Sequence, residues 1–272
     1  MLERLALGLL LSGLIGFVGY RRRSLSPSGV VGAILLGTLV FGLGGWAWGI
    51  LLVVFFVSSS ALSHFKAARK AAVAEKFSKG GQRDLAQTLA NGGAAAMAVI
   101  GHALWPDPIW AAAFIGAVAT VNADTWATEL GVLSRARPRL ITTGMSVEPG
   151  ASGGITLGGT LAALAGAGLI ALTAGVLQMT GGSSVGSVLV LLGVGTAAGL
   201  LGALADSVLG ATVQAIYVCE VCGRETERHP LHTDGGHTRL RRGAAWLNND
   251  WVNFLSAVCG ATLAALAWSI IQ

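Results

Sequence analysis

The chain has 272 residues, of which 53% are hydrophobic and only 11% are charged, and its formal net charge is +5. Soluble domains carry about 25% charged residues, so this composition excludes an ordinary soluble globular protein. Long apolar runs recur along the whole length without the short alternating segments of a membrane barrel, which predicts an all-α polytopic membrane protein. No polar stretch is long enough for a second domain, so we expect residues 1–272 to form a single transmembrane domain.

Apolar runs that could cross a bilayer occur about eight times, each with roughly 17 to 25 residues. We expect these transmembrane helices approximately at 3–20, 29–45, 46–64, 85–105, 109–133, 155–178, 185–210 and 250–271. Between them, the segments 21–26, 65–84, 134–150 and 211–249 hold 17 of the 18 lysine and arginine residues. With eight spans all four segments lie on one side of the membrane.

The positive-inside rule makes this basic side cytoplasmic and places both termini on the extracytoplasmic side. We therefore expect a multi-pass protein of a prokaryotic cell membrane, with cytoplasmic loops 65–84, 134–150 and 211–249. The positive charge then reflects topology and contact with membrane lipid or phosphate. It does not indicate a nucleic-acid partner, because the sequence has no basic and aromatic platform.

Acidic residues occur inside the expected spans. Asp124, Glu129 and Asp206 lie in apolar runs, and Asn249 and Asp250 begin the last one. A charged side chain at the bilayer centre costs roughly 2.5–3.5 kcal/mol on insertion scales, so each acid requires an explanation. In the expected topology all of them lie at the cytoplasmic ends of their helices, where carboxylate and amide oxygens together favour Mg²⁺. Alternatively, each acid caps a helix end or pairs with a loop arginine.

A polar loop between the fifth and sixth expected spans has the composition of a phosphate site. Glycines at the start of a helix let backbone N–H groups approach an anion, and the helix dipole favours negative charge there. No Walker pattern is present. The residues we expect to contact phosphate are Arg137, Arg139, Thr142 and Thr143, and, in the glycine-rich part, Gly150, Ser152, Gly153 and Gly154.

The basic segment 65–84 and the start of the fourth span face the same expected compartment. Alanine and lysine at helical spacing in 65–84 indicate a helix on the membrane surface, with a solvated basic face as the simple interpretation. The functional interpretation is a phosphate clamp formed by Lys79, Arg83 and Asp84, near Gln87 and Asn91 in the first turns of the fourth span.

A Cys-x-x-Cys pair at Cys219 and Cys222 is followed by His229, His232 and His237. One such pair and two histidines can complete a tetrahedral structural Zn²⁺ site. The histidine spacing differs from that of a standard zinc finger, and the alternative is a reduced cytoplasmic thiol pair.

Five motifs appear in order along nearly the whole chain: "NADTWATELG", "RLITT", "VEPGASGGITLGGT", "GALADSVLGATVQAIYVCEVC" and "WLNNDWVN". Together they resemble an integral-membrane family that includes the plant phytyl-phosphate kinase of the vitamin E pathway and transmembrane protein 19. The family is distantly similar to CTP-dependent polyprenol kinases and to CDP-diacylglycerol synthases.

The resemblance implies a kinase that converts an isoprenoid monophosphate into its diphosphate with a nucleoside triphosphate such as CTP as donor. It assigns catalytic roles in three acidic motifs to Asp124 and Glu129, to Asp206, and to Asn249 and Asp250. It also places Gly150, Gly153 and Gly154 in the glycine loop. One departure is "HTDGG", where family members commonly have His-Cys-Gly. This leaves Asp234 or His237 as a fourth zinc ligand beside Cys219, Cys222 and His232.

The leading hypothesis is therefore a Mg²⁺-dependent phytyl- or geranylgeranyl-type monophosphate kinase of tocopherol biosynthesis. In it, Asp124, Asp206 and Asp250 hold one or two Mg²⁺ ions, and Arg137, Arg139 and the glycine-loop backbone neutralise phosphate charge. The alternatives are a membrane transporter or lipid carrier, and a CTP-dependent cytidylyltransferase acting on a lipid phosphate.

Overall fold

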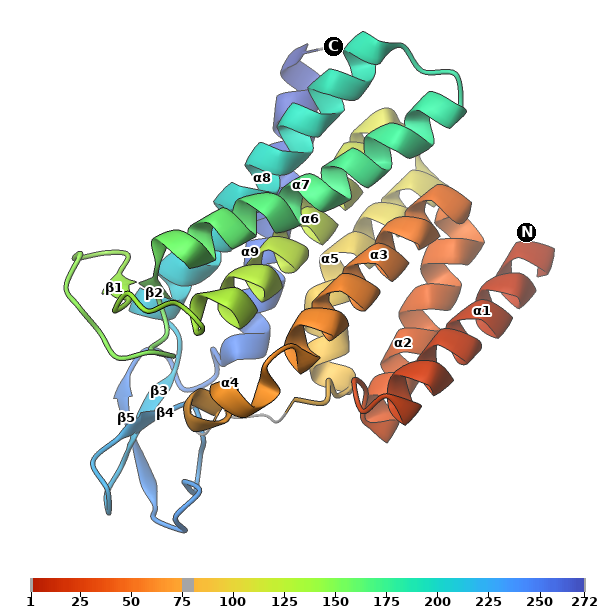
Figure 1. The fold of residues 1–272 in the computed structure, drawn as a ribbon. Coiled ribbons are helices and arrows are strands. Elements are labelled where there is room, and N and C mark those ends of the chain that lie inside the picture. The colour runs from red at the N-terminus through yellow and green to blue at the C-terminus, as the bar shows by residue number, and fades with distance from the viewer. Residues whose placement is uncertain (1, 75–80, 272) are drawn as a thin grey trace.

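The computed structural model describes residues 2–74 and 81–271, and the chain within these ranges is mostly helical (Figure 1). Eight long helices of this described part match the expected runs within a few residues. They are α1 (Leu2–Arg21), α2 (Pro27–Leu39) with its π-helical continuation η1 (Val40–Gly44), α3 (Trp46–His64), α5 (Leu85–Leu104), α6 (Pro108–Gly131), α7 (Leu157–Thr180), α8 (Val185–Thr212) and α9 (Asn249–Ile271). The short helix α4 (Ala67–Ala74) covers part of the helix expected in 65–84, whereas Lys79 lies outside the described residues.

Polar residues between the apolar runs start the helices. The side chains of Ser26, Asp84, Asp107, Thr156 and Ser184 each accept a hydrogen bond from a backbone N–H in the first turn of the helix that follows. These bonds satisfy N–H groups that have no partner within the helix. The Asp84 carboxylate accepts from Gln87 N at 2.8 Å in a capping box. Asp84 is thus a helix cap and does not line the cavity described below, contrary to its expected place in a phosphate clamp.

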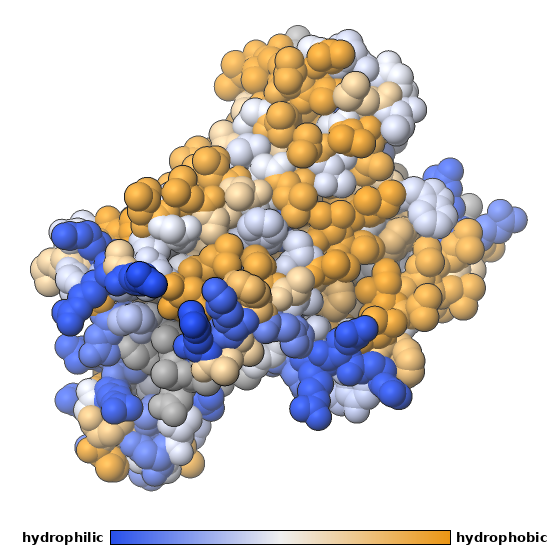
Figure 2. All heavy atoms as spheres, viewed as in Figure 1, coloured by the Kyte–Doolittle hydropathy of each residue, from blue (hydrophilic) through white to orange (hydrophobic). Residues whose placement is uncertain are grey.

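The two ends of the helical bundle differ in character. The connections that contain α4 and all the strands lie at one end, whereas the first and last described residues and the α7–α8 connection lie at the other (Figure 1). Figure 2 shows hydrophilic side chains gathered at the first end and hydrophobic side chains along the flanks of the helices. We call the first end the basic end, because it carries the four segments rich in lysine and arginine. Its assignment to the cytoplasm stays a prediction.

Six of the helices in the described residues are long and apolar enough to cross a membrane, namely α1, α2 with η1, α3, α7, α8 and α9. The expected spans at α5 and α6 have comparable lengths of 20 and 24 residues, but they are less apolar. Helix α6 carries Asp124 and Glu129 and is enclosed by α3, α5, α7, α8 and α9. Because neighbouring helices surround it, its residues need not be as apolar as those that face lipid.

Small residues allow this close enclosure. Every residue of α6 from Ala112 to Ala123 is buried. A Cβ atom added to Gly199 of α8 would lie 2.7 Å from the Cβ of Ala119 and 2.8 Å from the Cβ of Ala167. Alanine has no rotamer with which to move away, so Gly199 sets the separation of α8 from α6 and α7.

We expect the substitution Gly199→Ala to destabilise the protein by about 1–3 kcal/mol, because it overpacks a three-helix contact. Gly193→Ala on the same helix is the matched control, since a Cβ there meets nothing within 4 Å. In a helix interior this change is expected to stabilise by roughly 0.5–1 kcal/mol. Thermal unfolding in detergent measures both variants, and equal shifts in Tm would contradict this packing.

Two small antiparallel sheets at the basic end depart from the all-α expectation. β1 (Arg139–Leu140) pairs with β2 (Gly154–Ile155), and β3 (Ile216–Cys219) lies between β4 (Glu225–Thr226) and β5 (Thr238–Arg242). These strands have two to five residues, which is too short for a two-residue hydrophobic period to be recognised in the sequence.

Candidate active site at the basic end

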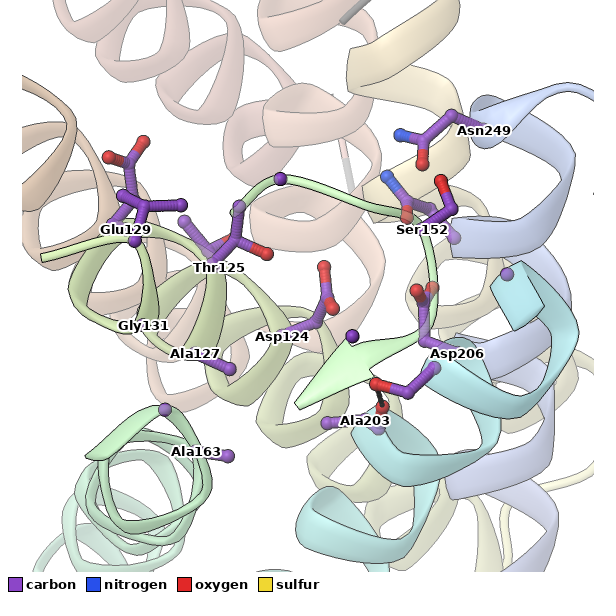
Figure 3. Close-up of a pocket in the computed structure, with 18 of the residues that line it drawn as sticks. Asp124, Thr125, Ala127, Glu129, Gly131, Ser152, Ala163, Ala203, Asp206 and Asn249 are labelled. Atoms are coloured by element: carbon purple, nitrogen blue, oxygen red, sulfur yellow. Dashed lines mark hydrogen bonds between the residues drawn. The ribbon is translucent and has the colours of Figure 1, made fainter. Parts of the chain in front are cut away.

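A cavity of about 630 Å³ opens at the basic end of the bundle. Side chains of α6, α8 and α9 line it together with the segment 150–156, which contains the end of the β1–β2 connection and β2 itself. Of the residues expected in the site, the cavity wall contains Asp124, Glu129, Asp206, Asn249, Asp250, Arg83, Gly150, Ser152, Gly153 and Gly154. In Figure 3, Asp124 and Asp206 extend into the same space, with Ser152 and Asn249 above Asp206 and Glu129 farther along α6.

A glycine contact explains why acids from three helices meet. The Thr120 side chain of α6 lies between Gly202 of α8 and Gly260 of α9, where an added Cβ would come within 2.2 and 1.9 Å of its Oγ1, respectively. Asp124 and Asp206 follow Thr120 and Gly202 by four residues, so each lies on the same helix face one turn nearer the basic end. The close approach at Thr120 therefore brings the two carboxylates to opposite walls of the cavity.

The oxygen atoms of this cavity fit a divalent cation. In the described part of the chain, Asp206 Oδ2 is buried and has no hydrogen-bond partner. Buried polar atoms rarely lack a partner, so this oxygen is free to bind a ligand such as a divalent cation. The neighbouring donors from Asp124, Asn249 and Asp250 are carboxylate and amide oxygens, which suit Mg²⁺ better than a transition metal.

Glu129 differs from the other acids of the cavity. Its carboxylate pairs with Lys70 Nζ from the segment after α3 and accepts a hydrogen bond from Ser63 Oγ at 2.6 Å. Lys70 also donates to the backbone oxygens of Leu62 and Ser63 at 2.7 and 3.0 Å. Glu129 thus holds the Lys70 ammonium at the cavity wall, which sequence reasoning missed because the two residues are far apart along the chain.

Arg83 is the expected clamp residue that does reach the cavity. Its guanidinium donates to Ser59 Oγ at 3.0 Å and Ser60 Oγ at 3.1 Å. Its backbone bonds to Ser24 and Ser26, and Gly29 permits this approach, since a Cβ there would lie 2.0 Å from the Arg83 oxygen. Burial lowers the pKa of Arg83, although arginine remains protonated in proteins.

We expected the glycine-rich loop to form the start of α7. This expectation is wrong, because the helix begins only after the Thr156 cap. The loop instead ends in β2, and Gly153 has a φ of +81°. It is fastened from the segment after α8. Arg242 donates to the backbone oxygens of Gly210 at 2.7 Å and Ser152 at 3.3 Å, while Glu227 accepts from Ser152 Oγ at 3.2 Å.

Other expected phosphate residues lie elsewhere. Arg137, Arg139, Thr142 and Thr143 are exposed and do not line the cavity. A tight turn at 140–145 follows β1, where the N–H of Leu140 donates to the Met145 oxygen and the N–H of Gly144 donates to the Leu140 oxygen. The Arg139 guanidinium donates to this same turn, at the Gly144 oxygen 2.9 Å away. Asn91 lies one helical turn beyond Gln87 and lines a separate, apolar cavity of about 70 Å³.

Sequence reasoning also missed several cavity residues. One of them, Asn253, could have been found, because it follows Asn249 by four residues on the same face of α9. The others come from loops or from neighbouring helix turns whose placement depends on the fold, namely Lys70, Thr156, Thr160, Ser207, Gln214 and Glu227.

The Cys-x-x-Cys pair belongs to a second cluster, outside this cavity. The ligand atoms of Cys219, Cys222, His232 and Asp234 lie within 4.8 Å of one another. His237 was expected here and is not part of the cluster. It pairs through its backbone with Leu231, and its side chain is exposed. The N–H of Gly236 donates a hydrogen bond to the Asp234 carboxylate, and this bond is the main reason that the pKa of Asp234 lies below the usual range. A hydrogen bond from the Cys222 thiol lowers this pKa further.

The fold and the cavity together define a helical integral membrane protein with an acidic, glycine-lined site at one end of its helices. The chain belongs to the family described as integral membrane protein DUF92, whose model matches residues 10–261. This membership confirms the expected class of membrane protein.

Relatives of the chain span kingdoms. Protein PGR of Arabidopsis thaliana is 36% identical, with 97% of this chain and 96% of the relative aligned. The membrane protein MJ0933 of Methanocaldococcus jannaschii is 31% identical, with 98% and 95% aligned. The chloroplastic protein VTE6 of Arabidopsis thaliana is 29% identical, with 91% of this chain and 66% of the relative aligned. No solved structure gives a significant match.

Proposed function

We propose that the protein is a membrane-embedded kinase that transfers the γ-phosphoryl group of a nucleoside triphosphate to an isoprenoid monophosphate. The single observation that carries this proposal is the gathering of carboxylates from α6, α8 and α9 beside a glycine-rich loop and the half-buried Arg83 in one cavity. Oxygen ligands for a divalent cation and positive groups for phosphate oxygens are the parts that phosphoryl transfer requires.

Asp124, Asp206 and Asp250, with the amide of Asn249, would hold Mg²⁺. When bound, the cation would neutralise charge on the donor phosphates. Arg83 would bind phosphate oxygens, and its hydrogen bonds to Ser59 and Ser60 fix its position and so reduce the entropy lost on binding. Lys70 would contribute positive charge at the cavity wall without a direct bond, because its three N–H groups already bond to Glu129 and to two backbone oxygens. Gly153 and Gly154 would let the loop backbone approach the phosphates closely.

The transfer forms a bond between an oxygen of the acceptor phosphate and the γ-phosphorus, and it breaks the bond to the β-bridging oxygen. A prenyl diphosphate and a nucleoside diphosphate result. Because the acceptor oxygen is already anionic, no general base is needed, and alignment and charge neutralisation supply the rate enhancement. The prenyl tail would lie along helix flanks, where large apolar side chains are exposed.

Two further lines of support come from outside the cavity. Membership of the integral membrane family agrees with a lipid-like substrate. The acidic and glycine motifs resemble those of the family that includes the plant phytyl-phosphate kinase, which favours a phytyl or geranylgeranyl chain and CTP as donor. We further propose that the basic end faces the cytoplasm of a prokaryotic cell, where nucleotide is available.

The direct test incubates the purified protein in detergent or liposomes with phytyl or geranylgeranyl phosphate, Mg²⁺ and each of the four common nucleoside triphosphates. We expect prenyl diphosphate and nucleoside diphosphate in equal amounts, and no product when EDTA is added. Release of pyrophosphate would instead indicate cytidylyl transfer. Failure to form product with every donor, together with substrate flux across liposomes, would favour the transport alternative.

A further inference from the structure

The three-stranded sheet β4–β3–β5 carries four potential metal ligands at one end, outside the proposed active site. Cys219 ends β3 and Cys222 lies in the turn after it, while His232 and Asp234 lie in the turn that precedes β5. Cys219 and His232 are buried, whereas Cys222 and Asp234 are exposed. Two turns on either side of β4 thus present their side chains to one point.

The separations between the ligand atoms match a tetrahedral zinc site. The Cys222 Sγ–His232 Nδ1 distance is 3.6 Å, Cys219 Sγ lies 3.5 Å from Asp234 Oδ1, and His232 Nδ1 lies 3.2 Å from that oxygen. Zinc bonds of about 2.3 Å to sulfur and about 2.0–2.2 Å to nitrogen and oxygen give tetrahedral edges of roughly 3.6, 3.6 and 3.4 Å, respectively. Three of the six edges therefore agree with one ion between the four atoms, all of which lie within 4.8 Å of one another.

The backbone around the cluster is shaped for sulfur ligands. The Cys222 N–H points at Cys219 Sγ, 3.5 Å away, and Gly223 closes the turn with a φ of +71°. In the other turn, a Cβ on Gly236 would lie 2.9 Å from Cys219 Sγ. Glycine at this position leaves room for the thiolate.

The sheet has little else to stabilise it. Among its strand residues in the described structure, the buried side chains are Ile216, Tyr217, Cys219, Thr226 and Thr238. Such a small core does not usually hold a sheet and two long turns in one conformation, and small domains commonly use a structural metal instead.

We propose that Cys219, Cys222, His232 and Asp234 bind one structural Zn²⁺ ion. Two thiolates and an imidazole favour zinc over Mg²⁺ or Ca²⁺. Four protein ligands leave no position for substrate, so this ion would have no direct part in catalysis. His229 is not a ligand, because its ring stacks on Tyr217 with the ring centroids 4.5 Å apart.

The zinc site would also fix the glycine-rich loop of the active site. Glu227 follows β4 directly and Arg242 ends β5, and these two side chains bind Ser152 and the α8 end at Gly210. Both strands pair with β3, which leads into the Cys219 turn. Loss of the ion should therefore loosen the loop 150–154 through Glu227 and Arg242.

Metal analysis of the whole protein tests this site. We expect mass spectrometry to find about one zinc per chain in protein purified without chelator and freed of any histidine tag. Cys222→Ser and His232→Ala should each lower the zinc content at least about tenfold. The matched control His237→Ala removes a histidine five residues away and should retain the metal. Co²⁺ reconstitution of the unaltered protein should give thiolate-to-cobalt charge-transfer absorption, which does not depend on any variant folding.

Absence of stoichiometric zinc with no thiolate–cobalt absorption would overturn the proposal, as would equal loss of zinc from the His232 and His237 variants. The structural coupling has its own readout. Removal of zinc by chelation should increase hydrogen exchange of the amides in 150–154, and unchanged exchange there would disprove the coupling. Neither measurement depends on kinase activity, so either can fail or succeed independently of the proposed function.

Discussion

Asp206→Asn is expected to lower the proposed prenyl-phosphate kinase activity by roughly 10²–10³-fold while leaving the protein folded. Asparagine has nearly the same shape as aspartate but removes the negative charge from a carboxylate whose Oδ2 lacks a partner among the described residues. In the absence of Mg²⁺, removing this charge from the neighbourhood of Asp124 should maintain or raise the Tm, because buried like charges repel each other. Activity assays and thermal unfolding on the same samples check both parts.

The matched control for this variant is Asp107→Asn. Asp107 caps α6 at the opposite end of the bundle, where its Oδ1 accepts from Ile109 N at 2.8 Å, and asparagine caps helices equally well. Its activity should stay within about twofold of the unaltered protein. A lowered Tm without loss of activity in Asp206→Asn would mean that this acid is structural.

Gly153→Ala is expected to lower the activity by about 10²-fold, because it displaces the glycine-rich loop that we propose as the phosphate contact. The φ of +81° disfavours alanine, and the added Cβ would lie 2.4 Å from the Cβ of Ala211 and 2.7 Å from its backbone nitrogen. Since neither atom can rotate away, the loop itself must move. Steady-state kinetics with saturating Mg²⁺ measures the effect, which should appear in kcat as well as in KM.

Gly144→Ala separates this collision from backbone strain. Gly144 also has a positive φ, +69°, but a Cβ there meets nothing within 4 Å. Both variants should lose roughly 1–2 kcal/mol of stability from the left-handed conformation, while only Gly153→Ala loses most of its activity. Equal activities in the two variants would show that the position of the loop does not matter.

The helices could be predicted from the sequence because their signal is local. A run of about twenty apolar residues that begins after a polar N-cap such as Asp107 or Thr156 determines a helix without knowledge of its neighbours. The hydropathy of α6 alone is lower than that of α7, α8 and α9, since α6 carries Asp124 and Glu129 and other helices cover its surface.

The site could be predicted only where residues lie on helices of known direction. Asp124, Asp206 and Asn249 come from such helices, and the structure places them around one cavity. Loop residues could not be placed in this way. Arg139 was expected at the phosphates and instead bonds to its own turn, whereas Arg242 fastens the loop through contacts that depend on the small sheet.

The ligand geometry of the cysteine cluster shows the same limit. Spacing along the chain left Asp234 and His237 as alternatives for the fourth position. The pairing of Leu231 with His237 in the turn decides between them, because it directs Asp234 toward Cys219 and leaves His237 exposed.

The position of a bound divalent ion tests the account most directly. Crystals of the protein grown with Mn²⁺ and a non-hydrolysable nucleotide should be measured at the manganese absorption edge. We predict an anomalous peak in the cavity between Asp124 and Asp206, within ligand distance of both carboxylates and next to the donor phosphates. A peak at any other place, or nucleotide bound with no ion between those two side chains, would contradict it.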